Sequence, residues 1–352
     1  MVPDGYDLRV ITRSNDLGDA SPLPVEVDKW TTRDGVAVRY VSVSRLRNLF
    51  TALSSVRRYE PDLMYVNSFF DFSMSIVPQL MRRIGYIRAK QVLLAPRGEF
   101  GEAAYASKSM KKRLFANVYR ALGLHRGIVW HASSIAEKAD IQRVWGAGSN
   151  VVVRQNDTLL PAVSLRPGVD VTEEGRPLAL VSLGRIVEHK GLHLVLEGLA
   201  DMSSQVTLDV YGPDEDEVYM TRCKDALDRL PKTVTVRFHA AVPHENVRDV
   251  LAGYDALVMP TAGENFGHVI AESLSVACPV ICSNTTPWSD VLHSGGGVVV
   301  GERTSEAWEI ALAEYALLNS SDRANRRFLA ANAYDKWRGN ESSPHVFDLV
   351  KV

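Results

Sequence analysis

Short runs of β-branched and apolar residues alternate with longer segments of helical period along the whole chain, and this alternation most constrains its fold. Such an order is typical of βαβ units and therefore of parallel sheets. The pattern occurs twice in the 352 residues, once in each half. It predicts an α/β protein with two Rossmann-like, doubly wound domains. Ligands of such folds bind at the carboxyl ends of the strands, so we expect both sheets to face a central cleft.

The two halves give similar sets of predicted elements. In the first half the expected strands are residues 8–12, 36–43, 63–67, 91–95, 128–131 and 151–154, and the expected helices include 45–58 and 108–122. In the second half the strands are 178–183, 206–211, 234–238, 256–259, 280–282 and 298–300, and the helices include 191–200, 217–229, 267–277 and 305–318.

A stretch rich in proline and glycine separates the two patterns, and such composition indicates a linker. We therefore predict an acceptor-side domain over residues 1–160, a linker over 161–177 and a donor-binding domain over 178–335. Residues 336–352 are expected to form a tail or helix that could return to the first domain.

The bulk composition excludes several classes of protein. The formal net charge is -2, from 40 basic and 42 acidic residues, which gives no general attraction to nucleic acid. The three cysteines, Cys223, Cys278 and Cys282, lie in apolar contexts and are expected to be buried, reduced thiols. The first residues lack a signal-peptide pattern, and no apolar run approaches the roughly 20 residues of a membrane span. These features favour a cytoplasmic protein.

One stretch of the second half has the composition of a ligand site. A buried strand ending at Met259 runs into a turn with Gly263 and Glu264, and a helix is expected to start near Gly267. The first backbone N–H groups of a helix lack internal partners and carry the positive end of its dipole, so they suit a phosphate or sugar oxygen. Glu272 lies further along the helix. Either glutamate alone could be an ordinary surface charge, but Glu272 has apolar neighbours and would need a partner there.

A second cluster of charge lies where the second half begins. A strand ends just before Arg185, and Lys190 precedes the next helix. Two cations on one loop can converge on a diphosphate, the arginine as a fork and the lysine as a point charge. A pair of unrelated surface cations is the alternative interpretation for this loop taken by itself.

With both motifs, the sequence resembles the retaining glycosyltransferases of family 4, also called glycosyl transferases group 1, which have the GT-B fold. Glu264 and Glu272 have the spacing of that family's paired glutamates, and Arg185 and Lys190 have the spacing of its Arg and Lys. The Pro-Trp pair that ends at Trp288 resembles a bacterial branch of the family.

The resemblance implies a function for each matching residue. Arg185 and Lys190 would bind the donor pyrophosphate, Glu264 the donor sugar and Glu272 the ribose hydroxyls. Backbone groups of Gly263, Asn265, Phe266 and Gly267 would complete the donor site. The donor would be a UDP-sugar or a GDP-sugar. Because the cations and the helix start can stabilise the leaving diphosphate, we expect no metal and no other cofactor.

The resemblance further implies sugar transfer with retention of anomeric configuration, by same-face attack and without an enzyme nucleophile. The acceptor would be a glycan or a lipid-linked molecule of a cell-surface polysaccharide, lipopolysaccharide or capsule. A GT-B phosphorylase or synthase is an alternative. A non-catalytic nucleotide-sugar-binding subunit, or a truncated inactive homologue, is another.

The first half matches the family more weakly. Asn67, Arg97 and Glu99 lie where predicted strands meet loops, and Arg97 stands where related enzymes often carry histidine. They are candidates for binding the acceptor, although a simple ion pair between Arg97 and Glu99 explains them equally well. The family's first strand and glycine-rich loop have no counterpart here. The basic helix from Lys108 could be a solvated face or a peripheral contact with the inner face of a membrane.

Overall fold

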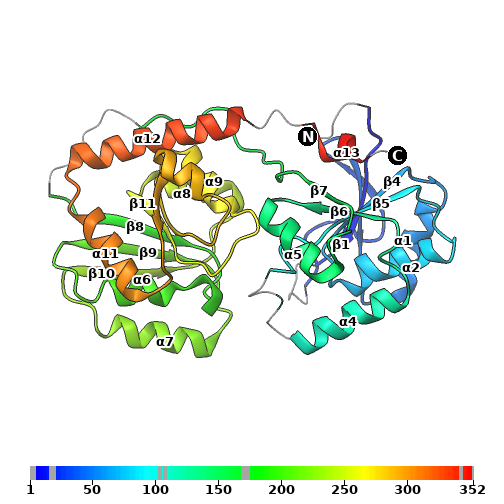
Figure 1. The fold of residues 1–352 in the computed structure, drawn as a ribbon, viewed down its shortest axis with the longest axis horizontal. Helices are drawn as coiled ribbons and strands as arrows, with labels where there is room; N and C mark the ends of the chain where they lie inside the picture. The colour runs from blue at the N-terminus through cyan, green and yellow to red at the C-terminus, as the bar shows by residue number, and fades with distance from the viewer. Residues whose placement is uncertain are drawn as a thin grey trace. The chain divides into compact units, whose positions relative to one another are not determined.

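The computed structural model describes residues 5–15, 21–101, 105, 109–167, 175–340 and 344–350. Its chain divides into two compact units (Figure 1). The first unit comprises Met1–Gln155 and Pro344–Val352, and the second comprises Asn156–Ser343. No helix in these described ranges has both the length and the apolar character that crossing a membrane requires.

The second unit is built on one parallel sheet of six strands, in the order β10-β9-β8-β11-β12-β13. This is the doubly wound order, in which the chain starts at the centre and moves first to one edge and then to the other. The strands are β8 (Leu178–Leu183), β9 (Val206–Tyr211), β10 (Val234–His239), β11 (Ala256–Met259), β12 (Val280–Ser283) and β13 (Gly297–Val300).

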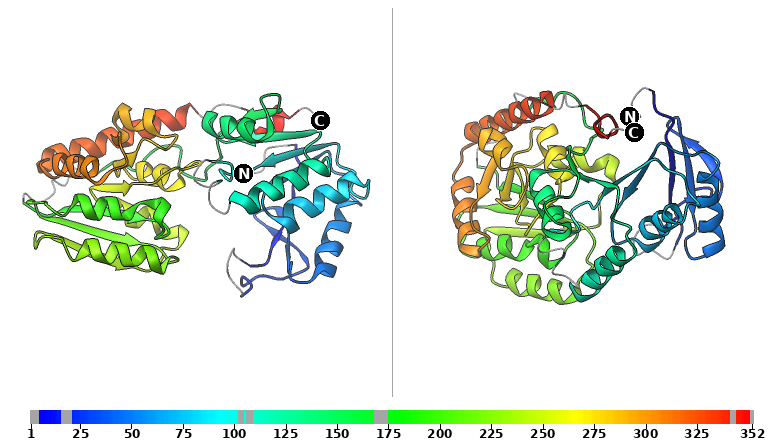
Figure 2. Two further views of the ribbon diagram at one scale, coloured as in Figure 1. Left: turned by 60° about the horizontal axis from the view of Figure 1, so that its bottom comes forward. Right: turned by 45° about the vertical axis from the view of Figure 1, so that its right-hand side comes forward.

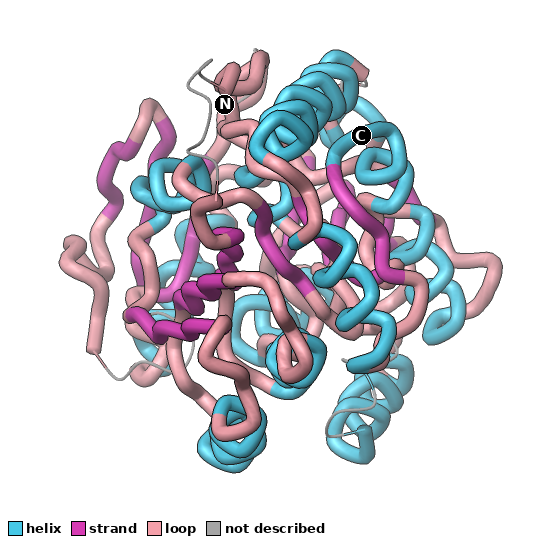
Figure 3. Tube along the Cα trace, turned by 90° about the vertical axis from the view of Figure 1, so that its left-hand side faces the viewer, coloured by secondary structure: helices cyan, strands magenta, loops and turns pink. Residues whose placement is uncertain are grey.

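Helices cover both faces of this sheet, as Figure 3 shows with strands in magenta and helices in cyan. One apolar core joins the sheet to α6 (Leu192–Gly198), α7 (Glu217–Leu227) and α11 (Ser305–Ala316). A second core, on the other face, joins it to α8 (Val247–Ala252), α9 (His268–Ser275) and α12 (Ser320–Gly339). The shorter turns are η2 (Glu188–Lys190), η3 (His244–Asn246), α10 (Ser289–Val291) and η4 (Leu292–Gly296).

The described residues of the first unit form two sheets. One has the order β1-β3-β2 and consists of β1 (Arg9–Arg13), β3 (Val36–Val41) and the antiparallel β2 (Trp30–Arg33). The other is parallel, in the order β4-β5-β6-β7, and consists of β4 (Leu63–Asn67), β5 (Gln91–Ala95), β6 (Ile128–Ala132) and β7 (Val151–Val153).

The helices that the structure describes in the first unit are α1 (Leu46–Val56), η1 (Phe72–Ile76), α2 (Val77–Arg83), α4 (Ser109–Ala121), α5 (Ile135–Trp145) and α13 (Val346–Leu349). Three of them, α1, α2 and α4, form one layer, and both panels of Figure 2 show them as neighbouring blue and cyan helices. Phe50 of α1 contacts Tyr86, which follows α2, at a ring distance of 5.5 Å. Tyr119 of α4 donates a hydrogen bond to Gln79 of α2.

The unit boundaries differ from the predicted ones. The chain divides after Gln155 and not at residue 160, and the described part of the predicted linker is packed on α12. There the Ser164 amide donates to Asp335 at 2.7 Å, and Tyr334 donates to the Pro161 carbonyl at 2.6 Å. Residues 168–174 of the predicted linker lie outside the described residues. At the other end α12 continues to Gly339, and the segment that returns to the first unit begins at Pro344.

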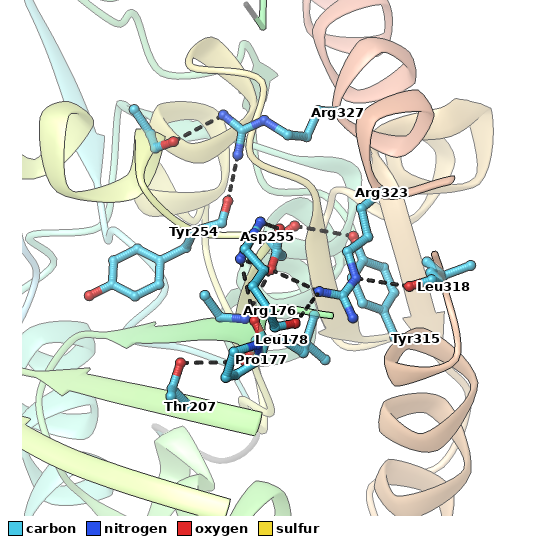
Figure 4. A network of polar contacts seen from close by, with 12 residues as sticks. Arg176, Pro177, Leu178, Thr207, Tyr254, Asp255, Tyr315, Leu318, Arg323 and Arg327 are labelled. Atoms are coloured by element: carbon cyan, nitrogen blue, oxygen red, sulfur yellow. Dashed lines mark hydrogen bonds and ion pairs between the residues drawn. The ribbon is translucent and has the colours of Figure 1, made fainter. Parts of the chain in front are cut away.

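A buried carboxylate ties the start of β8 to that of β11 and to α12 (Figure 4). Asp255 accepts both terminal nitrogens of Arg176 and the Ala179 amide, and Arg323 of α12 lies 3.7 Å from it. Its side chain is 1% exposed. An unpaired carboxylate as deeply buried as that of Asp255 would destabilise the fold by several kcal/mol. Its contacts with Arg176, Ala179 and Arg323 therefore hold the starts of β8 and β11 and the helix α12 together. They lie at the amino ends of the strands.

Candidate functional site

Two loops of the second unit carry three charged residues of the predicted donor site. Arg185 and Lys190 follow β8, and Glu264 follows β11. The strands β8 and β11 are parallel neighbours, paired through Leu180 with Ala256. Both loops therefore leave the carboxyl edge of the same sheet, the edge at which doubly wound folds bind ligands.

Lys190 and Glu264 form an ion pair between these two loops. The side chains are 27% and 16% exposed, so the pair is partly screened from water but open to a ligand. A backbone hydrogen bond of 2.8 Å from the Ala262 amide to the His189 carbonyl joins the same loops. The structure thus brings together two residues that are 74 positions apart in the sequence.

Gly191 explains how closely the loops approach. It has φ of +75°, and a Cβ atom placed there would lie 2.2 Å from the Pro260 carbonyl oxygen. Only glycine fits this combination of left-handed backbone and close contact. Arg303 fastens the junction, because it donates to the carbonyls of Pro260 at 3.0 Å and of Glu188 at 3.3 Å. Arg303 belongs to neither sequence motif, and no pattern in its own segment indicates this contact.

Positive charge gathers around His189 in the same junction. Burial lowers the pKa of His189, and the neighbouring Lys190, Arg185 and Arg303 lower it further, while Glu264 opposes them. Arg185 pairs with Glu215 at 3.1 Å and is 57% exposed, so its guanidinium lies at the surface. Three cations near one loop edge create a local attraction for anions in a chain whose overall charge is close to balanced.

The helix α9 begins next to this junction, as predicted from its motif. Gly267, with φ of +77°, is its N-cap, and no side chain caps the helix. Phe266 is buried, 3% exposed, and its ring belongs to the core. The indole of Trp288 donates to the Phe266 carbonyl. The Pro-Trp pair noted in the sequence therefore anchors the turn from which α9 starts.

Glu272 lies within α9 and is 7% exposed. Burial raises its pKa, and His244 and Arg248 act in the opposite direction. His244, from η3, is its nearest described ion partner, at 3.4 Å from Nδ1 to Oε1. Glu272 is therefore buried among apolar residues of α9, as expected from its neighbours in the sequence. Glu264 and Glu272 have different partners: Glu264 joins Lys190, and Glu272 joins the segment after β10.

A cavity of about 380 Å³ lies elsewhere in the second unit, between α8 and the sheet face of β8, β9 and β10. Asp209 and Arg237 are among its lining residues. Burial disfavours the Asp209 carboxylate, but bonds from Arg237, His239 and Tyr254 prevail and hold its pKa below the ordinary value. His239 also stacks on Tyr211 with ring centroids 4.4 Å apart. None of the predicted donor-site residues lines this cavity, so it is a weaker candidate site than the junction.

The predicted acceptor-side residues lie in the first unit. Arg97 follows β5 with φ of 55° and donates to Asn67 at 2.8 Å and to the Tyr65 hydroxyl at 2.9 Å. The Tyr65 hydroxyl in turn lies 2.6 Å from Nδ1 of the buried His131. Asn67 and Arg97 are therefore in contact at the carboxyl ends of β4 and β5. Tyr65 and His131 extend the group and were not predicted.

Glu99 has a different environment. Its carboxylate accepts the Ser68 hydroxyl at 2.6 Å and the amides of Phe69 and Phe70 at 2.5 and 3.2 Å. Burial raises its pKa in spite of these bonds. Three donors from one turn indicate that Glu99 shapes the loop after β4.

The described residues contain no group of three or more His, Cys, Asp or Glu side chains arranged to hold a metal ion. The three cysteines are buried and free, as the sequence predicts.

The two α/β units have the GT-B fold, and comparison with solved structures supports this class. The structure of sucrose-phosphate synthase from Thermosynechococcus elongatus matches with a TM-score of 0.69 at 17% identity, over 95% of this chain and 85% of that one. Anabaena HepE, in complex with UDP-glucose, matches with a TM-score of 0.65 at 16% identity, over 86% of this chain and 82% of its own. The predicted fold class is confirmed.

Within this fold, residues 170–335 match the family model described as glycosyl transferases group 1. The lipopolysaccharide core biosynthesis glycosyltransferase LpsE of Rhizobium meliloti is 27% identical over 172 residues, which cover 48% of this chain and 47% of that protein. The chain spans between 32% and 58% of the length of four curated relatives that it matches. Both donor motifs lie inside the matched region.

Proposed function

We propose that this protein transfers a sugar from a nucleoside-diphosphate sugar, a UDP-sugar or a GDP-sugar, to a glycan or lipid-linked acceptor of a cell-surface polysaccharide. The observation that carries the proposal is the junction of Lys190 with Glu264 beside the open start of α9. The family match over residues 170–335 and the name of the lipopolysaccharide relative support it.

In the proposed reaction the bond between the anomeric carbon and the diphosphate breaks, and a bond to an acceptor oxygen forms on the same face of the sugar. The acceptor proton leaves with the diphosphate. Arg185, Lys190 and the N–H groups at the start of α9 stabilise the negative charge that develops on the phosphates. Glu264 binds sugar hydroxyls, and Glu272 binds the ribose. Neither carboxylate acts as a nucleophile. The configuration is retained because the acceptor attacks the face of the sugar from which the diphosphate leaves.

These cations take the place that a divalent metal has in other sugar transferases, so the proposed reaction is independent of metal. We further propose that the protein acts in the cytoplasm. Asn67 and Arg97 are the proposed acceptor-side residues, together with Glu99 as the residue that shapes their loop.

Calorimetry with UDP-glucose and GDP-mannose, paired with a turnover assay in EDTA, tests this proposal. We expect one nucleotide to bind and to raise the free energy of unfolding by about 2.7 kcal/mol at 100 times its dissociation constant. Turnover with an acceptor extract should persist in EDTA. Binding without any turnover would favour a non-catalytic nucleotide-sugar-binding subunit. The absence of binding to both UDP-glucose and GDP-mannose would refute the proposal.

A further inference from the structure

A row of aromatic side chains connects helix α12 to the turn that precedes α9. The ring of Trp337, in α12, lies 4.7 Å from that of Trp288, and the ring of Trp288 lies 5.7 Å from that of Phe266, measured between centroids. The rings of Trp337 and Phe266 are farther apart, at 6.4 Å. All three side chains belong to or pack against the core that joins α9 and α12 to the sheet (Figure 1). Trp288 is therefore the main contact between α12 and this turn.

A hydrogen bond within this row holds one peptide group. The indole Nε1 of Trp288 donates to the Phe266 carbonyl. That carbonyl and the Gly267 N–H belong to the same planar, trans peptide group, so they point in opposite directions. By holding the carbonyl, Trp288 therefore also sets the direction of the Gly267 N–H.

The Gly267 amide is an open donor at the start of α9. Gly267 is the N-cap residue of this helix, with φ of +77°, and no side chain caps the helix. Within the described ranges, no acceptor bonds to the Gly267 amide. The amide lies at the positive end of the helix dipole, where an anionic ligand is favoured. Its direction matters, because a hydrogen bond weakens steeply when the N–H no longer points at its acceptor.

We infer that Trp288 is a positioning residue for the donor diphosphate, and that Trp337 positions the same turn through Trp288. The inference rests on the proposed function, in which the amides at the start of α9 bind the diphosphate. Trp288 is 1% exposed, so it does not itself offer a contact to a ligand. It acts through the peptide group between Phe266 and Gly267, which it holds in one orientation.

Trp308 supplies a matched control for this role. It is also a buried tryptophan of the second unit, 0% exposed, but it belongs to the core on the other face of the sheet. Its Nε1 has no hydrogen-bond partner in the part of the chain that the structure describes. Replacing either tryptophan by phenylalanine removes the same atoms from a packed core. Only Trp288→Phe also releases the Phe266 carbonyl, so the two variants separate positioning from packing.

Calorimetry with the nucleoside diphosphate that the wild type binds, UDP or GDP, measures this difference. We expect Trp288→Phe to bind it roughly tenfold more weakly, which corresponds to the loss of one hydrogen bond. Trp308→Phe should bind as the wild type does. Urea unfolding of both variants confirms that the folded protein is being measured. Equal affinities of Trp288→Phe and Trp308→Phe would overturn the inference.

The matching nucleoside, uridine or guanosine, lacks the phosphates and isolates their contribution. Because Trp288 is assigned to an amide that binds the diphosphate, Trp288→Phe should bind the nucleoside as the wild type does. A site that is damaged as a whole would lose affinity for both ligands. A nucleoside affinity that falls as much as the diphosphate affinity would therefore show a merely structural role and overturn the assignment.

Trp337→Phe tests the second part of the inference. Trp337 is only half-buried, so this variant also carries the test if Trp288→Phe does not fold. We expect a smaller loss of diphosphate affinity than for Trp288→Phe, and no loss of nucleoside affinity. The double variant should bind the diphosphate no more weakly than Trp288→Phe alone, because residues that act through one contact are not additive. Losses that add would overturn the assignment of Trp337.

The wild type separates this inference from the proposed function. If the wild type binds neither UDP nor GDP, the proposed function fails and the inference fails with it. If the wild type binds one of them, and Trp288→Phe and Trp337→Phe keep the wild-type affinity, the proposed function stands and this inference alone is wrong.

Discussion

The ammonium of Lys190 and the carboxylate of Glu264 are ion-pair partners across two loops that leave neighbouring strands of one sheet. Each group is therefore already paired before any ligand arrives. In the proposed reaction a donor diphosphate competes with Glu264 for Lys190, and the released Glu264 becomes available to sugar hydroxyls.

Lys190→Ala should weaken binding of the nucleoside diphosphate by about 2 kcal/mol, because a charge-assisted contact to phosphate is lost. Calorimetry with UDP or GDP measures the change. Lys224→Ala, an exposed lysine of α7, is the control and should bind as the wild type does. Equal affinities of Lys190→Ala and the wild type would exclude a phosphate contact for Lys190.

Glu264→Gln should separate binding from turnover. The substitution removes the competitor for Lys190, so the nucleoside diphosphate alone should bind at least as tightly as to the wild type. Turnover should fall about 100-fold, the usual cost of removing one group that contacts the reacting centre. Calorimetry and initial rates measure the two effects. If the variant keeps the wild-type rate, Glu264 has no part in the transfer step.

Gly191→Ala should damage the junction itself. The new methyl group would meet the Pro260 carbonyl oxygen at 2.2 Å on a backbone with φ of +75°. We expect a loss of about 2 kcal/mol in the free energy of unfolding, together with weaker donor binding. Urea unfolding measures the first effect. Gly301→Ala is the control, since open space surrounds its added methyl group.

Glu272→Gln should change how stability depends on pH. Burial raises the pKa of Glu272, so the folded protein holds this proton more tightly than the unfolded chain does. The resulting stabilisation is complete below the ordinary value of about 4.3 and is lost as the pH rises through the raised pKa. The wild type should therefore lose stability relative to Glu272→Gln over that window in urea titrations. The exposed Glu309→Gln is the control, and a pH-independent difference for Glu272→Gln would contradict the assigned burial.

Asp255→Ala should cost about 3 kcal/mol of stability, because the partly buried guanidinium groups around it lose their counter-charge. Arg176 and Arg323 are the groups concerned (Figure 4). Urea unfolding, with the exposed Asp225→Ala as control, measures the loss. Donor affinity of the remaining folded protein should be unchanged, since this network lies at the amino ends of the strands.

The strands of this protein are readable from its sequence because most are buried parallel strands. Such strands are continuous apolar runs, and β8, β9 and β11 have the predicted bounds. The strand β2 was not predicted, because it is antiparallel, half-exposed and polar. The sequence nevertheless contains a hairpin signal, the dipeptide Asp34-Gly35. Both residues have positive φ in the structure, as the two central residues of a type I′ turn require.

The candidate site could be predicted only where its residues share a motif. Glu264 and Gly267 belong to one continuous segment, and Arg185 and Lys190 to another. The contacts of Arg303, His244 and Trp288 depend on how distant segments meet in space, which a single sequence does not encode in any local pattern. The predicted roles of these donor-site residues, and of Asn67, Arg97 and Glu99, stay predictions for the experiments above.

The close contact of Gly191 with the Pro260 carbonyl has a consequence for engineering donor preference. Arg303 donates a hydrogen bond to the same carbonyl. The segments around Gly191, Pro260 and Arg303 therefore form one structural unit, although they are far apart in the sequence. A chimera that takes only one of these loops from a homologue should therefore lose the close contact between the loops. A chimera that exchanges both loops together with residue 303 should keep it.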